Sequence, residues 1–184
     1  MDDIVKAALA KWPNVPDCYG WLGLDARGNW YMRDDAAQAA GPFAAGSVAS
    51  KGSLLQHEKL IDFIARNYQA ETQGGAAGQW YFQNGPQRVY VELELAPLIW
   101  RLSEQFVPTS HTRQHATVQQ CLVDEAGFVY LHTALGLGLV HTLDVGLAAD
   151  AIEQELWTPQ PVLRADLPKQ FGFVQSPQAH HVGA

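Results

Sequence analysis

The histidines in the second half of the chain have a spacing that could bind a metal ion. His111 and His115 are four residues apart, so on a helix they would share one face and could grip zinc, with His132 or Asp124 as a third ligand. The familiar zinc-hydrolase motif places a glutamate directly after the first histidine, and Thr112 stands there instead. Neighbouring threonines also disfavour a helix, so a polar loop is the preferred interpretation. A metal-dependent hydrolase centred on His111, His115 and His132 is therefore kept as an alternative.

The sequence lacks the other familiar catalytic patterns. Cys18 and Cys121 lie far apart and have no local signature that ties either one to a histidine, so both are interpreted as reduced, packed thiols. No Gly-x-Ser-x-Gly motif, dinucleotide-binding glycine loop or phosphate-binding lysine loop occurs. Glu92 and Glu94 share one strand face, where paired carboxylates usually keep an exposed surface soluble. The sequence thus predicts no catalytic residue and no cofactor, and it favours a protein that is not an enzyme.

The clearest structural signal is a pair of β-patterned runs between Gln79 and Leu95. Proline cannot donate the hydrogen bond that would close a two-residue turn at Asn84-Gly85, so we expect a four-residue loop from Asn84 to Gln87. In this register, Phe82 pairs with Val89, and the apolar residues that point inward are Trp80, Phe82, Val89, Val91, Leu93 and Leu95. The residues expected to point outward are Tyr81, Gln83, Arg88, Tyr90 and Glu92.

The outward set combines aromatic rings, an amide and a guanidinium, which can stack on and hydrogen-bond a small polar ligand or an extended peptide. We therefore interpret the protein as a small-ligand or peptide-binding regulatory module, with Tyr81, Gln83, Arg88, Tyr90 and Glu92 as the ligand-binding residues. Two alternatives stay open. The same face could be an ordinary solvated sheet surface, and unpaired strand edges could instead make the protein a structural homodimer.

Two further hairpins are expected, over residues 18–33 and 118–133. Each turns at an Asp-x-x-Gly-x-x-Tyr pattern, which begins at Asp25 and at Asp124, and a duplicated hairpin or shared turn chemistry explains the repeat equally well. Apolar residues at helical spacing predict a helix near the N-terminus and another from Ser53, which forms a capping box with Gln56. Helices and hairpins are segregated along the chain. The expected fold class is therefore α+β, with a mainly antiparallel sheet built from three hairpins and helices packed on one face.

Length and composition predict one globular domain over residues 1–184, with a loop over residues 34–52 and a frayed tail from about residue 176. The 12 basic and 19 acidic residues give a net charge of −7, which argues against binding to nucleic acid. No apolar run has the length of a membrane span, and the acidic start does not resemble a secretory signal. We therefore expect a cytoplasmic protein with neither nucleic acid nor a membrane as a partner.

Two passages of the sequence resemble a known family. The first is Trp12-Pro13-Asn14-Val15-Pro16 continuing to Gly20-Trp21-Leu22-Gly23-Leu24-Asp25-Ala26-Arg27-Gly28, and the second runs from Phe82 to Val91. Both are similar to a family of small proteobacterial proteins known only as a domain of unknown function, and the similarity extends over most of the chain. The resemblance implies a bacterial cytosolic protein. It implies no activity, cofactor or catalytic residue.

Overall fold

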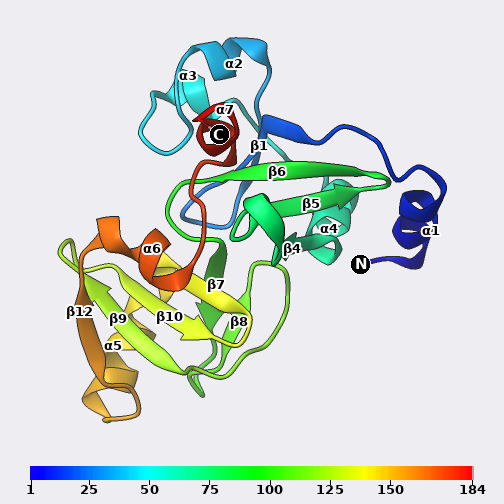
Figure 1. The fold of residues 1–184 in the computed structure, drawn as a ribbon. Coiled ribbons are helices and arrows are strands. Elements are labelled where there is room, and N and C mark those ends of the chain that lie inside the picture. The colour runs from blue at the N-terminus through cyan, green and yellow to red at the C-terminus, as the bar shows by residue number, and fades with distance from the viewer. Residues whose placement is uncertain (184) are drawn as a thin grey trace. The chain divides into compact units, whose positions relative to one another are not determined.

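The chain divides into two compact units. The computed structural model describes residues 1–183, and its first unit comprises Met1–Asp25, Asn29–Glu94 and the chain from Phe173 onward. The second unit comprises Ala26–Gly28 and Leu95–Gly172. Each unit is built on one six-stranded sheet (Figure 1). The expectation that the chain forms a single domain stays a prediction.

The first sheet is mixed. Its strand order is β3 (Ser53–Leu54), β2 (Trp30–Met32), β1 (Cys18–Leu24), β6 (Gln87–Leu93), β5 (Trp80–Asn84) and β4 (Tyr68–Ala70). β1 pairs antiparallel with β2 but parallel with β6, whereas β5 pairs antiparallel with both β6 and β4. The parallel pair joins strands that are far apart in the sequence and places the β5–β6 hairpin in the middle of the sheet.

The register predicted for this hairpin is confirmed, since Phe82 pairs with Val89. Pairing continues to Asn84 and Gln87, so the loop itself is only Gly85-Pro86, which preserves the parity of the expected four-residue loop. Gly85 has a φ of 57°, a left-handed conformation that glycine adopts readily. The set predicted to point inward is buried at Trp80, Phe82, Val91 and Leu93, and partly buried at Val89 and Leu95.

The second sheet is also mixed. Its strand order is β12 (Pro159–Val162), β9 (Gln120–Asp124), β10 (Val129–Thr133), β11 (Gly136–Val140), β7 (Leu98–Leu102) and β8 (Pro108–Ser110). β9, β10 and β11 form an antiparallel meander, whereas β12 joins parallel to β9 and β7 joins parallel to β11. The meander includes the hairpin expected over residues 118–133.

These sheets correct the expected fold class. The fold is α+β, but across residues 1–183 it has two mixed six-stranded sheets and seven helices, not a mainly antiparallel sheet built from three hairpins with helices on one face. All three hairpins are present. The parallel pairs were missed because they join strands that are distant in the sequence, whereas turn residues indicate pairing only between neighbours.

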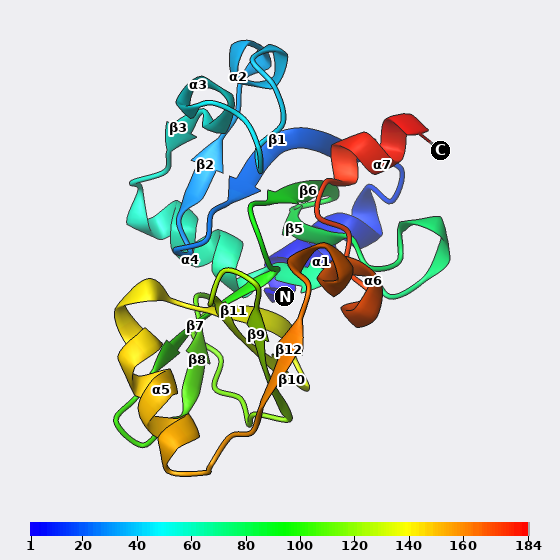
Figure 2. The ribbon, with the colours of Figure 1, turned by 90° about the vertical axis from the view of Figure 1, so that its left-hand side faces the viewer.

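Helices lie on both faces of the first sheet. α4 (Glu58–Arg66) packs against β5, where the rings of Phe63 and Phe82 meet edge to face with centroids 5.4 Å apart. α7 (Pro177–Gly183) lies against β1 and β6, on the other side of the sheet from α4 (Figures 1 and 2). α1 (Asp3–Lys11) buries Val5. The sheet of the first unit therefore has helices on both of its faces.

The remaining helical elements of the second unit follow its sheet strands. α5 (Val145–Glu153) comes after a short 3₁₀ turn, Thr142–Asp144, and α6 (Leu167–Phe171) comes after another, Arg164–Asp166. α5 buries Ala148 and Ala151, and α6 buries Leu167. Among residues 1–183, no helix is both long and apolar enough to cross a membrane.

The helix expected from Ser53 begins later, at Glu58. Ser53 and Leu54 form β3 and pair with β2, so their backbone groups take part in the sheet rather than in a helix. His57 caps α4 instead, because its Nδ1 accepts a hydrogen bond from the N–H of Leu60 at 3.3 Å. Pairing between distant strands has overridden the local capping-box pattern.

The stretch expected as a loop contains α2 (Asp35–Ala39) and α3 (Val48–Lys51). The buried guanidinium of Arg33 anchors it by donating hydrogen bonds to the carbonyl oxygens of Gly20, Gly41 and Ser50. The tail expected to fray from about residue 176 forms α7 as far as Gly183, and Ala184 lies outside the described residues. Composition could not indicate this order, because the contacts that hold both segments are mainly polar and involve the backbone.

The two Asp-x-x-Gly-x-x-Tyr repeats form the same turn. Asp25 Oδ1 accepts a hydrogen bond from the N–H of Asn29 at 2.8 Å, and Asp124 Oδ1 accepts one from the N–H of Phe128 at 2.9 Å. In each repeat the tyrosine six residues further on hydrogen-bonds the same carboxylate. The repeat therefore has one structural role in both hairpins, which is to lock the turn onto the strand that follows it.

Candidate functional site

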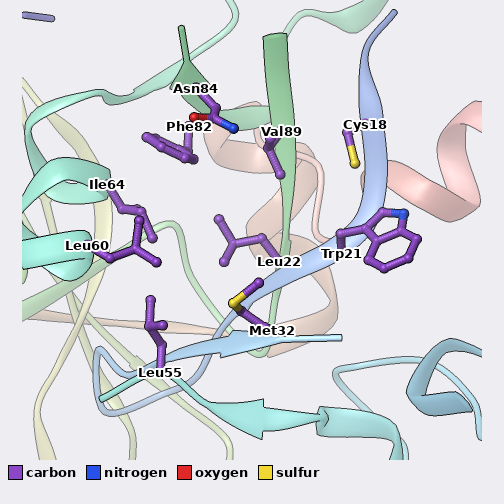
Figure 3. A pocket seen from close by; sticks show the side chains of 10 residues that line it. All are labelled: Cys18, Trp21, Leu22, Met32, Leu55, Leu60, Ile64, Phe82, Asn84 and Val89. Atoms are coloured by element: carbon purple, nitrogen blue, oxygen red, sulfur yellow. The ribbon is translucent and has the colours of Figure 1, made fainter. Parts of the chain in front are cut away.

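A pocket with a volume of about 290 Å³ opens between α4 and one face of the first sheet (Figure 3). It is lined by Cys18, Trp21, Leu22, Met32, Leu55, Leu60, Ile64, Phe82, Asn84 and Val89. In Figure 3, Leu22 on β1 and Leu60 on α4 point toward each other across the space. Because almost all of the lining is aliphatic or aromatic, the pocket is an apolar surface that the fold leaves open.

The packing of α4 explains why this space remains. The helix carries its apolar residues along one side, and Phe63 fixes that side against Phe82. Ile64, in the later part of the helix, is only 2% exposed, whereas Leu60, in its first turn, is half-buried. The helix thus closes over the sheet near Ile64 and leaves the side near Leu60 uncovered.

A bulge in β1 shapes the rim of the pocket. Between Cys18 and Leu22 the register of β1 against β6 shifts, and Gly20 within this segment has a φ of 81°. This left-handed conformation favours glycine, but the alternation of apolar and polar residues does not reveal the bulge. Within the bulge, Trp21 stands at the rim and remains 43% exposed, and the next residue, Leu22, points into the pocket.

The pocket offers little of the chemistry that catalysis requires. Asn84 is exposed at its edge, and within residues 1–183 the side-chain amide of Asn84 has no hydrogen-bond partner. Burial raises the pKa of the Cys18 thiol, which favours the neutral thiol over the nucleophilic thiolate near neutral pH. The lining contains no acidic, basic or imidazole side chain. The arrangement therefore suits binding of an apolar group beside one hydrogen-bonding amide.

The residues predicted from the sequence to bind a ligand lie on the opposite face of the same sheet. Three of them come together there. The ring centroids of Tyr81 and Tyr90 are 5.7 Å apart, and the guanidinium of Arg88 lies 5.2 Å from the centre of the Tyr81 ring. Arg88 also forms an ion pair with Glu71 at 3.0 Å. These three residues thus form a compact aromatic and cationic cluster.

The other two predicted residues make separate contacts. Gln83 Nε2 donates a hydrogen bond to the carbonyl oxygen of Gly85 at 3.0 Å. Glu92 accepts hydrogen bonds from Ser176 Oγ at 2.6 Å and from the N–H of Gln178 at 2.9 Å. Burial raises the pKa of Glu92, although these two hydrogen bonds oppose the shift. Glu92 therefore holds the start of α7 rather than facing solvent.

The expectation that this face is exposed is wrong. Tyr81, Gln83, Tyr90 and Glu92 are all buried, and Arg88 is partly buried. The start of α7 covers Glu92, and the ring of Tyr19 stacks on Tyr90 with centroids 4.6 Å apart. Alternation in the sequence separates two faces of a strand but does not tell which face a distant segment covers. The role of the five residues in ligand binding stays a prediction.

The structure does not bring His111, His115 and His132 together as a metal site. His111 Nδ1 accepts a hydrogen bond from the N–H of Ile99, and His115 Nδ1 lies 2.9 Å from the hydroxyl of Thr109. His132 packs against an aromatic ring of α6, and burial lowers its pKa. Throughout the described part of the chain, no group of three His, Cys, Asp or Glu side chains could hold a metal ion. Residues 111–115 form a turn and not a helix, as the preferred interpretation of a polar loop predicted, so the helical spacing of the metal-site alternative does not occur.

Comparison with known proteins places the chain in a family. It matches the family described as "Protein of unknown function (DUF2946)" over residues 1–178, and it belongs to that family. This match confirms the resemblance to an uncharacterised family that was inferred from the sequence. No curated protein matches the sequence.

Two solved structures are similar to this one. A DUF1285 family protein from Silicibacter pomeroyi DSS-3 is 14% identical with a TM-score of 0.47, and the match covers 82% of this chain and 84% of that chain. A DUF1285 family protein from Shewanella baltica OS155 is 14% identical with a TM-score of 0.45, and the match covers 71% of this chain and 91% of that chain. These likenesses are too distant to assign a function.

Proposed function

We propose that the first unit is a binding module that holds a small, mainly apolar molecule in the pocket between α4 and the sheet. The observation that carries the proposal is an open pocket whose walls, including Leu22, Leu60 and Val89, are apolar and lie on regular secondary structure. Apolar walls with a few polar groups are typical of small-molecule sites. The lack of charged groups in the lining supports binding rather than catalysis.

The volume sets the size of the ligand. At about 290 Å³ the pocket is at the lower end of the usual range for ligand sites, which begins near 300 Å³. An engineered protein cavity of about 150 Å³ holds benzene. The pocket therefore suits one aromatic ring or a short aliphatic chain with a small substituent. The amide of Asn84 at the edge can hydrogen-bond a hydroxyl or carbonyl group on that substituent.

Calorimetric titration with benzyl alcohol tests the proposal. We expect saturable binding to the full chain, and loss of about tenfold or more in affinity for the variant Leu60→Phe, because the added ring fills the space that Leu60 faces. Leu156→Phe is the matched control, since Leu156 is 58% exposed in the second unit. Unchanged affinity in Leu60→Phe would show that benzyl alcohol binds elsewhere.

A second comparison isolates the polar contact. Toluene has nearly the shape of benzyl alcohol but lacks the hydroxyl group. Asn84→Ala should weaken binding of benzyl alcohol by about two- to tenfold, the usual net contribution of one hydrogen bond, and leave binding of toluene unchanged. Equal losses for both probes would mean that Asn84 shapes the pocket but does not bind the hydroxyl group.

A further inference from the structure

The helix that covers the polar face of the first sheet is attached mainly by polar contacts. Of its residues, only Pro177 is buried, whereas His180, His181 and Val182 are exposed. Below it, Gln79, Tyr90 and Glu92 are each at most 3% exposed. A helix with so little apolar burial gains little free energy from docking, and local opening of such a segment needs far less energy than global unfolding.

The imidazole of His181 completes a stack of three rings. The ring of Tyr19 lies between those of Tyr90 and His181, with centroid distances of 4.6 Å and 4.2 Å and interplanar angles of 6° on both sides. Tyr19 and Tyr90 belong to paired strands at the centre of the sheet, whereas His181 comes from α7 near the end of the described chain. The stack thus has two fixed rings and one ring on a weakly attached segment.

The polar groups around the stack favour a cation with N–H donors. Asp17 is close enough to interact electrostatically with both Tyr19 and His181, and Glu71 is near Asp17. The positive charge of Arg88 interacts with Asp17 as well as with Glu71, so two carboxylates and one guanidinium leave a net negative charge near the stack, which favours a cation over Tyr19. Beneath His180, Gln79 Nε2 lies 3.3 Å from His180 Nδ1. The buried Oε1 of Gln79 has no hydrogen-bond partner within residues 1–183.

We propose that the outer face of Tyr19 is a binding site for a planar aromatic cation, and that His181 on α7 occupies this site as an intramolecular stand-in. A ligand of this kind would replace the imidazole on the Tyr19 ring. Its N–H groups would be directed toward the carboxylate of Asp17. The site lies on the opposite face of the sheet from the apolar pocket, so it goes beyond the function proposed for that pocket.

Because the ligand competes with His181 for the Tyr19 ring, the proposal predicts the direction in which affinity changes when His181 is removed. The apparent affinity of a site falls in proportion to the fraction of molecules in which the site is open. Removing the imidazole with His181→Ala should increase that fraction. A stacked aromatic pair contributes an amount that corresponds to about two- to tenfold in an equilibrium constant, so affinity for the cation should rise by about that factor.

The experiment titrates the full chain with benzamidine at about pH 8. We expect His181→Ala to bind benzamidine about two- to tenfold more tightly than the wild type, and the neutral analogue benzamide to bind more weakly to both. Adding Tyr19→Leu to His181→Ala should remove this gain. His115→Ala is the matched control, because His115 is exposed in the second unit.

Equal affinity of His181→Ala and the wild type would overturn the proposal, as would tight binding that survives Tyr19→Leu. Hydrogen exchange provides a readout that does not need a variant. Benzamidine should speed exchange of the Gln178 amide, whose N–H is bonded to Glu92, because α7 is displaced. Unchanged exchange at saturating benzamidine would also overturn the proposal. The benzyl alcohol titration is independent, so failure of one proposal does not decide the other.

Discussion

The two faces of the first sheet differ in accessibility, and the accessible face is the apolar one. The face with Leu22, Phe82 and Val89 is apolar, yet it borders an open pocket. The face with Tyr90 and Glu92 is polar, yet it is closed by α7. Accessibility therefore depends on which distant segment covers a face, and not on the side chains of that face alone.

The difference in accessibility has a separate physical cause on each face of the sheet. On the apolar face, α4 is held at Phe63 and Ile64, and nothing fills the space near Leu60. On the polar face, Glu92 accepts hydrogen bonds from the hydroxyl of Ser176 and from the N–H of Gln178 in α7. Directional hydrogen bonds define the position of that cover even though they attach it weakly, whereas apolar contact alone tolerates a gap.

The largest expected effect comes from truncating one ring on each face. Trp80→Ala and Tyr90→Ala should each lower the free energy of unfolding by about 3 to 5 kcal/mol, because both rings are buried. Urea unfolding followed by near-ultraviolet circular dichroism measures both changes. A loss of about 1 kcal/mol or less in Tyr90→Ala would mean that the polar face is open in solution, which would remove the contrast between the two faces.

A smaller loss is expected where Arg33 anchors the segment over residues 34–52. Arg33→Met removes three hydrogen bonds to backbone carbonyl oxygens and should cost about 2 to 3 kcal/mol of unfolding free energy. Arg33→Lys keeps the charge but loses the planar fork, so it should restore only part of the loss. Full recovery in Arg33→Lys would show that charge, and not hydrogen-bond geometry, holds the segment.

The pH dependence of Glu92 should be smaller again. Burial raises its pKa in the folded state, so the protonated form is favoured on folding, and its contribution to stability is largest below the unfolded pKa of about 4.5 and falls as pH rises through the folded pKa. Relative to Glu92→Gln, the urea midpoint of the wild type should therefore decrease as pH rises from about 4.5 to 7. A difference that is constant with pH would contradict this account.

The wild type must be compared with Glu92→Gln because other titratable groups change stability with pH in the opposite direction. Asp144 in the second unit accepts a hydrogen bond from Arg101, which lowers its pKa. Its contribution to stability is present above the unfolded pKa and is lost as pH falls through the folded pKa. Subtracting the Glu92→Gln curve removes this background.

The smallest effect is expected at the rim of the pocket. Trp21→Ala should change the free energy of unfolding by about 0.5 kcal/mol or less, because the ring is 43% exposed despite its size. The same denaturation experiment measures it beside Trp80→Ala, which is the matched buried tryptophan. A loss comparable to that of Trp80→Ala would mean that the rim is packed shut and that the pocket is closed.

The sequence predicts the local parts of this fold well. Hairpin register follows from alternation and from the missing N–H of Pro86, and the structure confirms the pairing of Phe82 with Val89. The Asp25 and Asp124 turns also form as their residue types indicate. Each of these features depends on residues that are close together in the chain.

What the sequence could not predict depends on distant contacts. The parallel pairing of β1 with β6, and the docking of α7 on Glu92, join segments that no local pattern relates. The pocket needs the bulge at Gly20 and the incomplete cover by α4, neither of which has a sequence signature. Residues 111–115 form a turn, in agreement with the polar loop that their neighbouring threonines predicted.

The most direct test of the central claim is a methyl NMR titration of the full-length protein with benzyl alcohol. The account predicts saturable shifts confined to the methyl groups of Leu22, Leu60, Ile64 and Val89, with no change at buried Leu131 and Leu139 of the second unit. Such a result would locate an apolar ligand in the open pocket of the first sheet. Shifts that are absent at saturation, or spread equally over both units, would contradict it.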